Sequence, residues 1–221
     1  MKGFLLRPHP LAKPQDGPVS RYINRYFSAP VSRLLMRTSL TPNQVSIGVS
    51  LFSLLMFYTG LKGYLFTTGL LLQVASILDG VDGEMARAKK RVSEFGALLD
   101  TVLDYWMDSA GLISIGLALS VNSKIPLNII WVIIALTITI RLISQFIVKT
   151  CRVKKAHISS ETRDVTTFLI FLGCLFGSLY SSYILLAILG IINLVRIDNS
   201  IFRLYWSYLE ERKAYESGNN I

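Results

Sequence analysis

Charged residues are scarce in this chain of 221 residues, where Asp, Glu, Lys and Arg together make up only 17% of the sequence. A soluble globular domain carries about 25%, and 52% of the residues here are hydrophobic. The same hydrophobicity excludes a disordered chain, because disorder requires low hydrophobicity. Cysteine is scarce as well: Cys151 and Cys174 lie in or beside apolar segments and no pattern pairs them, which excludes a disulfide-stapled secreted domain. A polytopic membrane protein remains.

Long apolar runs are what the sequence does contain. A spanning helix needs roughly 20 mostly apolar residues. Six segments fit, at about 43–61, 64–86, 97–121, 126–149, 165–181 and 183–201. We therefore predict an all-α fold with residues 1–40 as a cytoplasmic, interfacial segment, 41–205 as a domain of six transmembrane helices and 206–221 as a cytoplasmic tail. Met1–Ser20 has no long apolar core, so no cleavable signal is expected.

The placement of Lys and Arg predicts the orientation, because these residues accumulate on the cytoplasmic side of spans. Seven precede the first span, four lie between the second and third, five between the fourth and fifth, and four in the C-terminal segment. Lys62 and Lys124 alone fall in the other connections, and Arg141 lies within the fourth span. Both termini are therefore expected in the cytoplasm, in a protein integral to the cell membrane. The net charge of +9 suits anionic membrane lipids as partners, and no motif indicates nucleic-acid binding.

The segment before the first span mixes basic with aromatic and aliphatic residues between Val19 and Met36. This mixture is typical of an amphipathic helix in the membrane interface, which Pro30 is expected to break into two short helices. Thr41 is a good N-cap and Pro42 suits a first helical position, so the first span is predicted to start there.

Carboxylates gather where the second and third spans meet. One face of the second span carries Asp79, Asp82, Gly83, Ala86 and Arg87, and one face of the third carries Gly96, Asp100 and Asp104. The connection at 89–94 is short, so the two helices are expected to be antiparallel neighbours with four carboxylates in one cytoplasm-facing cavity. Glu84 points off this face and is expected at the surface, whereas Asp108 extends the row and could pair with Arg141.

Four unpaired carboxylates in one cavity would repel one another, and divalent cations would relieve this repulsion. Ligands that are all oxygen favour Mg²⁺ or Mn²⁺ over Zn²⁺. Two such ions are a common way to handle an in-line displacement at phosphorus. The small residues on the same faces either let helices pack closely or leave space for a flat ligand, and Arg87 either binds a diphosphate or caps a helix C-terminus.

The spacing of these residues resembles the signature of the CDP-alcohol phosphotransferases. All eight fixed positions of D-x2-D-G-x2-A-R-x8-G-x3-D-x3-D are filled between Asp79 and Asp104, a far more specific pattern than a lone glycine motif. Thr41, Pro42 and Asn43 before the first span match as well. The resemblance implies a membrane enzyme that transfers the phosphoryl-alcohol of a CDP-alcohol to an acceptor hydroxyl and releases CMP.

The resemblance also implies a role for each matching residue. Two divalent cations, Mg²⁺ or Mn²⁺, would be held by Asp79, Asp82, Asp100 and Asp104. Asp104 would be the general base for the acceptor hydroxyl. The CDP moiety would be bound by Asn43, Asp82, Gly83, Ala86, Arg87 and Gly96.

Residues 13–25, KPQDGPVSRYINR, resemble the start of a subgroup that includes the di-myo-inositol-phosphate-phosphate synthases. This resemblance implies CDP-inositol as donor and inositol 1-phosphate as acceptor. A phospholipid headgroup synthase using CDP-diacylglycerol or CDP-archaeol is the alternative within the family. The subgroup is often fused behind a cytidylyltransferase; none precedes the motif here, so the chain either acts alone, with such a domain as a possible partner, or is a fragment of a fusion.

A phosphorylated polyol acceptor would require a cationic site near the cytoplasmic ends of the fourth and fifth spans. Arg141 and Arg163 are the favoured candidates, followed by Lys149 and Arg152.

A divalent-cation transporter is the alternative of another class, because converging carboxylates also suit ion passage. The aspartates cluster at the cytoplasmic ends and the halves show no repeat, which counts against it. Gly173 and Gly177 allow a homodimer without requiring one.

Overall fold

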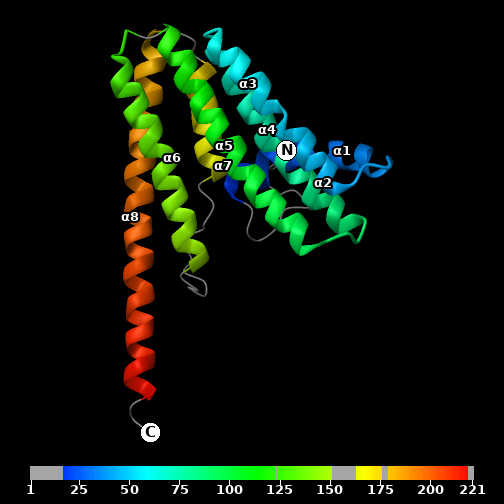
Figure 1. Ribbon diagram of the computed structural model, residues 1–221, viewed down its shortest axis with the longest axis vertical. Helices are drawn as coiled ribbons and strands as arrows, with labels where there is room; N and C mark the ends of the chain where they lie inside the picture. The colour runs from blue at the N-terminus through cyan, green and yellow to red at the C-terminus, as the bar shows by residue number, and fades with distance from the viewer. Residues whose placement is uncertain (1–16, 123, 151–162, 176–178, 219–221) are drawn as a thin grey trace, which may run out of the picture.

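The computed structural model describes residues 17–122, 124–150, 163–175 and 179–218, which form helices joined by short connections (Figure 1). A short π-helix, η2 (Ser20–Asn24), leads into α1 (Arg25–Met36). The remaining elements are α2 (Pro42–Ser50), α3 (Phe52–Leu61), α4 (Leu65–Ala88), α5 (Glu94–Asn122), α6 (Leu127–Thr150), α7 (Arg163–Leu175) and α8 (Leu179–Gly218). The described ranges contain no strand, so the predicted all-α fold is confirmed.

Helix α4 is the centre of the arrangement. It packs against α1 and α2 on one side and against α3, α5 and α7 on the others, while α6 pairs with α8 at the far edge. Gly69 of α4 allows one of these contacts, because a Cβ there would lie 2.4 Å from the Cβ of Cys174 in α7. Gly60 of α3 likewise lies so close to α5 that a Cβ would come 2.4 Å from the carbonyl oxygen of Ser114. Small residues therefore let α4 and α5 approach their neighbours closely.

Two apolar clusters hold the helices together. The larger cluster joins α3 to α8 through fully buried side chains such as Met56, Ile115 and Leu189. The smaller one consists of Val45, Val81 and Met85, against which residues of α1 pack. Val49 and Leu78, which pack against the smaller cluster, and Met107 of the larger one line a common pocket between α2, α4 and α5.

Three stretches of the described chain are long and apolar enough to cross a membrane: Pro42–Leu61, Leu65–Ala88 and Glu94–Val121. They coincide with the first three predicted spans. Two further apolar helices, Leu127–Ile140 and Asp164–Leu175, are shorter. Apolar helices of this length indicate an integral membrane protein.

The last helix is longer than the apolar run that predicts a span within it. Helix α8 begins at Leu179 and continues to Gly218, whereas the predicted span covers about residues 183–201. No proline or glycine interrupts the chain between Gly190 and Gly218, so nothing stops the helix where its apolar stretch ends. The end of α8 therefore projects far beyond the other helices (Figure 1).

The predicted break at Pro30 is also wrong, because α1 runs through this residue from Arg25 to Met36. Proline removes one backbone donor from a helix, and here its ring lies on the exposed side. The irregular turn lies earlier, in the π-helix Ser20–Asn24.

Candidate active site

The start of α2 is fixed by its own sequence. Thr41 caps the helix: its side chain accepts a hydrogen bond from the backbone N–H of Gln44, and the Gln44 side chain accepts one from the backbone N–H of Thr41. Pro42 occupies the first helical position, so the predicted start of this span is confirmed. This reciprocal cap satisfies two backbone donors and sets which side chains of α2 face α4 and α5.

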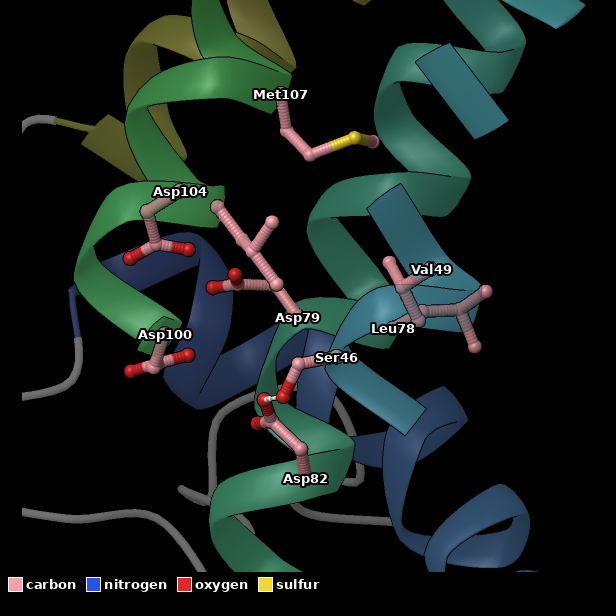
Figure 2. A pocket seen from close by; sticks show the side chains of 9 residues that line it. Ser46, Val49, Leu78, Asp79, Asp82, Asp100, Asp104 and Met107 are labelled. Atoms are coloured by element: carbon pink, nitrogen blue, oxygen red, sulfur yellow. Dashed lines mark hydrogen bonds between the residues drawn. The ribbon is translucent and has the colours of Figure 1, made fainter. Parts of the chain in front are cut away.

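Four aspartates from α4 and α5 line one pocket. Carboxylate oxygens of Asp79, Asp100 and Asp104 all lie within 4.8 Å of one another. Figure 2 shows these three side chains turned towards the same space, with Asp82 one helical turn further along α4. The apolar part of the lining comes from Val49, Leu78, Leu103 and Met107. The helical spacing that predicted two facing rows thus corresponds to the arrangement in the structure.

Asp82 is held by a residue that the sequence analysis missed. The Ser46 hydroxyl of α2 donates a hydrogen bond to one Asp82 carboxylate oxygen (Figure 2). Ser46 also lines the pocket. The available signal was its spacing: Ser46 follows Asn43 by three residues on a helix whose start was predicted, which puts both on one face.

The other residues predicted to bind CDP are not part of the pocket lining, and two close approaches involve them. Asn43 Oδ1 lies 3.2 Å from where a Cβ on Gly96 would stand, so α2 and α5 approach each other at this glycine. Arg87 Nη1 lies 3.3 Å from the corresponding position on Gly83. Arg87 is exposed, whereas Gly83, Ala86, Asn43 and Gly96 are half-buried.

A tight turn after α4 brings α5 back alongside it. Lys90 adopts a left-handed conformation with φ of 52°, and the backbone N–H of Arg91 donates to the Ala86 carbonyl at 2.8 Å. Lys89 Nζ donates to the backbone carbonyls of Thr38 at 3.0 Å and Leu40 at 2.7 Å. The turn that aligns the two aspartate rows is therefore tied to the segment between α1 and α2.

Glu84 corrects the sequence analysis, which placed it at the surface. Its side chain is buried and forms an ion pair with Arg25 of α1. The side of α4 that points away from the aspartates is covered by α1, a long-range contact that helical periodicity within α4 does not reveal.

The predicted acceptor site falls on side chains outside the described part of the chain. Arg141, Lys149 and Arg163 belong to described helices, but their side chains are not described, and Arg152 lies outside the described residues altogether. Asp108 is buried, while the side chain of its predicted partner Arg141 is again outside the description.

The pocket has the donor chemistry of a divalent-cation site. Three carboxylates within 4.8 Å of one another offer only oxygen ligands, which are those that Mg²⁺ and Mn²⁺ prefer. A fourth carboxylate, Asp82, lines the same pocket. The aspartate cluster could therefore bind a divalent metal.

The sequence of this chain is similar to those of several known proteins. A bifunctional IPC transferase and DIPP synthase of Thermococcus kodakarensis is 40% identical over 121 residues, which is 55% of this chain and 26% of that protein. The one from Rubrobacter xylanophilus is 43% identical over 116 residues. The matched region thus spans about a quarter of these relatives. An archaetidylinositol phosphate synthase of Pyrococcus horikoshii is 30% identical over 195 residues, covering 85% of this chain and 92% of the relative.

Solved structures share the fold. A phosphatidylinositol phosphate synthase of Mycobacterium tuberculosis, solved with CDP-DAG bound, superposes with a TM-score of 0.68 at 18% identity, over 83% of this chain and 94% of that one. The same synthase in complex with manganese and citrate gives a TM-score of 0.67.

Residues 39–195 of this chain match the CDP-alcohol phosphatidyltransferase family. The chain belongs to this family, which favours an enzyme over the divalent-cation transporter that a row of aspartates also allowed.

Proposed function

We propose that this enzyme transfers a phosphoryl-alcohol from a CDP-alcohol to a polyol phosphate in a reaction that depends on two divalent cations, Mg²⁺ or Mn²⁺. The observation that carries the proposal is the convergence of Asp79, Asp100 and Asp104, with Asp82 in the same pocket. These four residues would hold the ions, which neutralise the charge of the diphosphate and stabilise in-line displacement. Asn43, Gly83, Ala86, Arg87 and Gly96 would bind the CDP moiety together with Asp82.

Asp104 and Ser46 have further roles in the proposed reaction. The acceptor hydroxyl oxygen attacks the phosphorus that bears the donor alcohol, and the bond from this phosphorus to the bridging oxygen breaks, so that CMP leaves. Asp104 accepts the hydroxyl proton, because a carboxylate within hydrogen-bond reach can act as general base. Ser46 keeps Asp82 turned into the pocket through its hydrogen bond.

For the substrates we propose CDP-inositol as donor and inositol 1-phosphate as acceptor, giving di-myo-inositol phosphate phosphate. Support comes from residues 13–25 and from the bifunctional IPC transferase and DIPP synthases, which are 40–43% identical to this chain over about a quarter of their length. A lipid donor, CDP-archaeol or CDP-diacylglycerol, is the second candidate, because the archaetidylinositol phosphate synthase matches over 92% of its own length. Arg141 and Arg163, with Lys149 and Arg152, would bind the acceptor phosphate.

One pair of reactions distinguishes the donors. Purified enzyme with Mg²⁺ is incubated with labelled inositol 1-phosphate and either CDP-inositol or CDP-diacylglycerol, and the label is partitioned between water and organic solvent. We expect a new water-soluble product with CDP-inositol alone. An organic-phase product with the lipid donor alone would contradict the di-inositol assignment and identify a phospholipid headgroup synthase.

We further propose six spans with both termini and the aspartate pocket on the cytoplasmic side. The asymmetry of basic residues supports this orientation. Exposed Tyr26, Phe27 and Leu34 beside exposed Arg33 on α1 support its contact with the membrane interface.

This topology predicts the result of cysteine labelling. In a variant without Cys151 and Cys174, Val92→Cys tests the turn after α4 and Lys124→Cys the connection after α5; both positions are exposed. In intact cells a membrane-impermeant maleimide should modify position 124 and reach position 92 only after lysis. The opposite pattern would place the pocket away from cytoplasmic CDP substrates.

A further inference from the structure

A polar seam joins the N-terminal segment to the back of α4. Gln73 Nε2 donates to Asn24 Oδ1 at 3.0 Å, and Asn24 Nδ2 donates to the Ser76 hydroxyl at 3.4 Å. About two turns further along α4, Glu84 forms its ion pair with Arg25. The segment that begins at residue 20 therefore contacts α4 between Gln73 and Glu84, a stretch that also carries Asp79 and Asp82.

The ion pair is buried on both sides. Arg25 is 6% and Glu84 8% exposed. The Ser28 hydroxyl donates to the same Glu84 oxygen at 3.3 Å. The Arg25 guanidinium also lies 3.5 Å from the carbonyl oxygen of Gly80. A Cβ at position 80 would stand 2.8 Å from Arg25 Nη1, so the guanidinium fits into a notch that the missing side chain leaves.

The contact between α1 and α4 contains buried polar atoms that have no hydrogen-bond partner. Four buried side-chain polar atoms in the described part of the chain have no hydrogen-bond partner, and three belong to residues of α1 and α4: Ser32 Oγ, Gln73 Oε1 and Glu84 Oε2. A buried ion pair adds little stability over apolar packing, and its best-attested role is to fix the register between elements. One helical turn of slip along α4 would move its aspartates by about 5.4 Å.

The two residues of α4 that contact Arg25, Gly80 and Glu84, lie on the same turns of the helix as Asp79 and Asp82. Gly80 follows Asp79 directly, and Glu84 lies two residues beyond Asp82, on the opposite side of the helix. A helix held from behind at 80 and 84 presents 79 and 82 at a fixed height opposite Asp100 and Asp104. Ligand geometry tolerates errors of only about 0.5 Å.

We propose that Arg25 and Glu84 are positioning residues, which set the register of α4 and thereby the geometry of the metal-binding aspartates. The inference rests on the proposed metal site. It assigns to the N-terminal segment a part in building the pocket, in addition to any contact with the membrane.

The test measures metal binding directly. Mn²⁺ is titrated into purified full-length protein and free Mn²⁺ is followed by electron paramagnetic resonance. Loss of a hydrogen-bond partner of a metal ligand typically weakens metal binding 10- to 100-fold. Glu84 is proposed to act on the ligands through the register of α4, so Glu84→Gln should weaken Mn²⁺ binding by about 10-fold, the lower end of that range. It should also raise the Mg²⁺ concentration for half-maximal activity, with an unchanged KM for the acceptor. Arg25→Lys, which keeps a cation in the seam, should lose less affinity than Arg25→Met.

Two further variants control for a general effect of charge and for misfolding. Arg33→Met removes a cation from the exposed side of α1 and should bind Mn²⁺ like the wild type. The double variant Arg25→Met/Glu84→Met removes both buried charges, so it should fold even where a single change leaves an unpaired charge, and it should still bind Mn²⁺ weakly.

The outcomes separate this inference from the proposed function. Wild-type protein that binds no Mn²⁺ would overturn the metal site itself. Mn²⁺ binding by the wild type, with equal affinity in the folded double variant, would overturn the positioning role alone.

Discussion

Asp104→Asn should lower turnover by about 10²–10⁴-fold, the usual contribution of a positioned general base. Asparagine keeps the size of the side chain but can neither accept the acceptor proton nor supply a negatively charged ligand. Asp79→Asn and Asp100→Asn should also lose activity by orders of magnitude, because these carboxylates lie within 4.8 Å of one another and of Asp104. CMP release per enzyme under saturating substrates is the measurement.

A matched control separates the pocket from a general effect of charge. Glu94→Gln removes a carboxylate from the exposed start of α5 and should retain full activity. Near-normal turnover in any two of the aspartate variants would rule out a site that needs all of its carboxylates.

Chelation should abolish activity completely. The pocket concentrates carboxylates that repel one another without a counter-charge, and a diphosphate adds further negative charge, so we expect no CDP-alcohol binding to metal-free protein. Calorimetric titration with the donor, before and after treatment with EDTA, measures this directly. Addition of Mg²⁺ or Mn²⁺ in excess over the chelator should restore both binding and turnover. Donor binding of equal affinity in EDTA would contradict a role for metal in holding the diphosphate.

The two aspartate rows could be predicted because they depend only on local geometry. Offsets of three and four residues put Asp79 and Asp82 on one face of a helix, and Asp100 and Asp104 on another. The short connection then makes the two helices neighbours. Neither step requires knowledge of the rest of the fold, and the observed pocket contains all four residues.

Ser46 and Glu84 could not be assigned in the same way, because their partners lie on other helices. Ser46 meets Asp82 across 36 residues of sequence, and Glu84 meets Arg25 across 59. A carboxylate that points away from a functional face looks like a surface residue unless one knows that another helix covers it. Periodicity gives the direction of a side chain along its own helix, and packing decides what that side chain contacts.

Helix ends differ in the same way in how well the local sequence predicts them. Thr41 and Pro42 carry the start of α2 in their own chemistry, so this boundary was predicted correctly. The predicted span at 183–201 ends where hydrophobicity falls, whereas α8 continues to Gly218, because a helix also continues through polar sequence that lacks a breaker. Loss of apolar character marks the membrane boundary of a segment and does not mark the end of the helix.

A comparison of the wild type with Asp104→Asn is the most direct measurement of the proposed reaction. Each is given Mg²⁺, CDP-inositol and inositol 1-phosphate, and CMP and the phosphodiester product are measured in the same samples, with donor binding measured separately. We expect equal amounts of CMP and product from the wild type, and a variant that binds the donor but releases neither at more than about one hundredth of the wild-type rate. CMP release at the wild-type rate from Asp104→Asn would contradict the role of Asp104 as the general base.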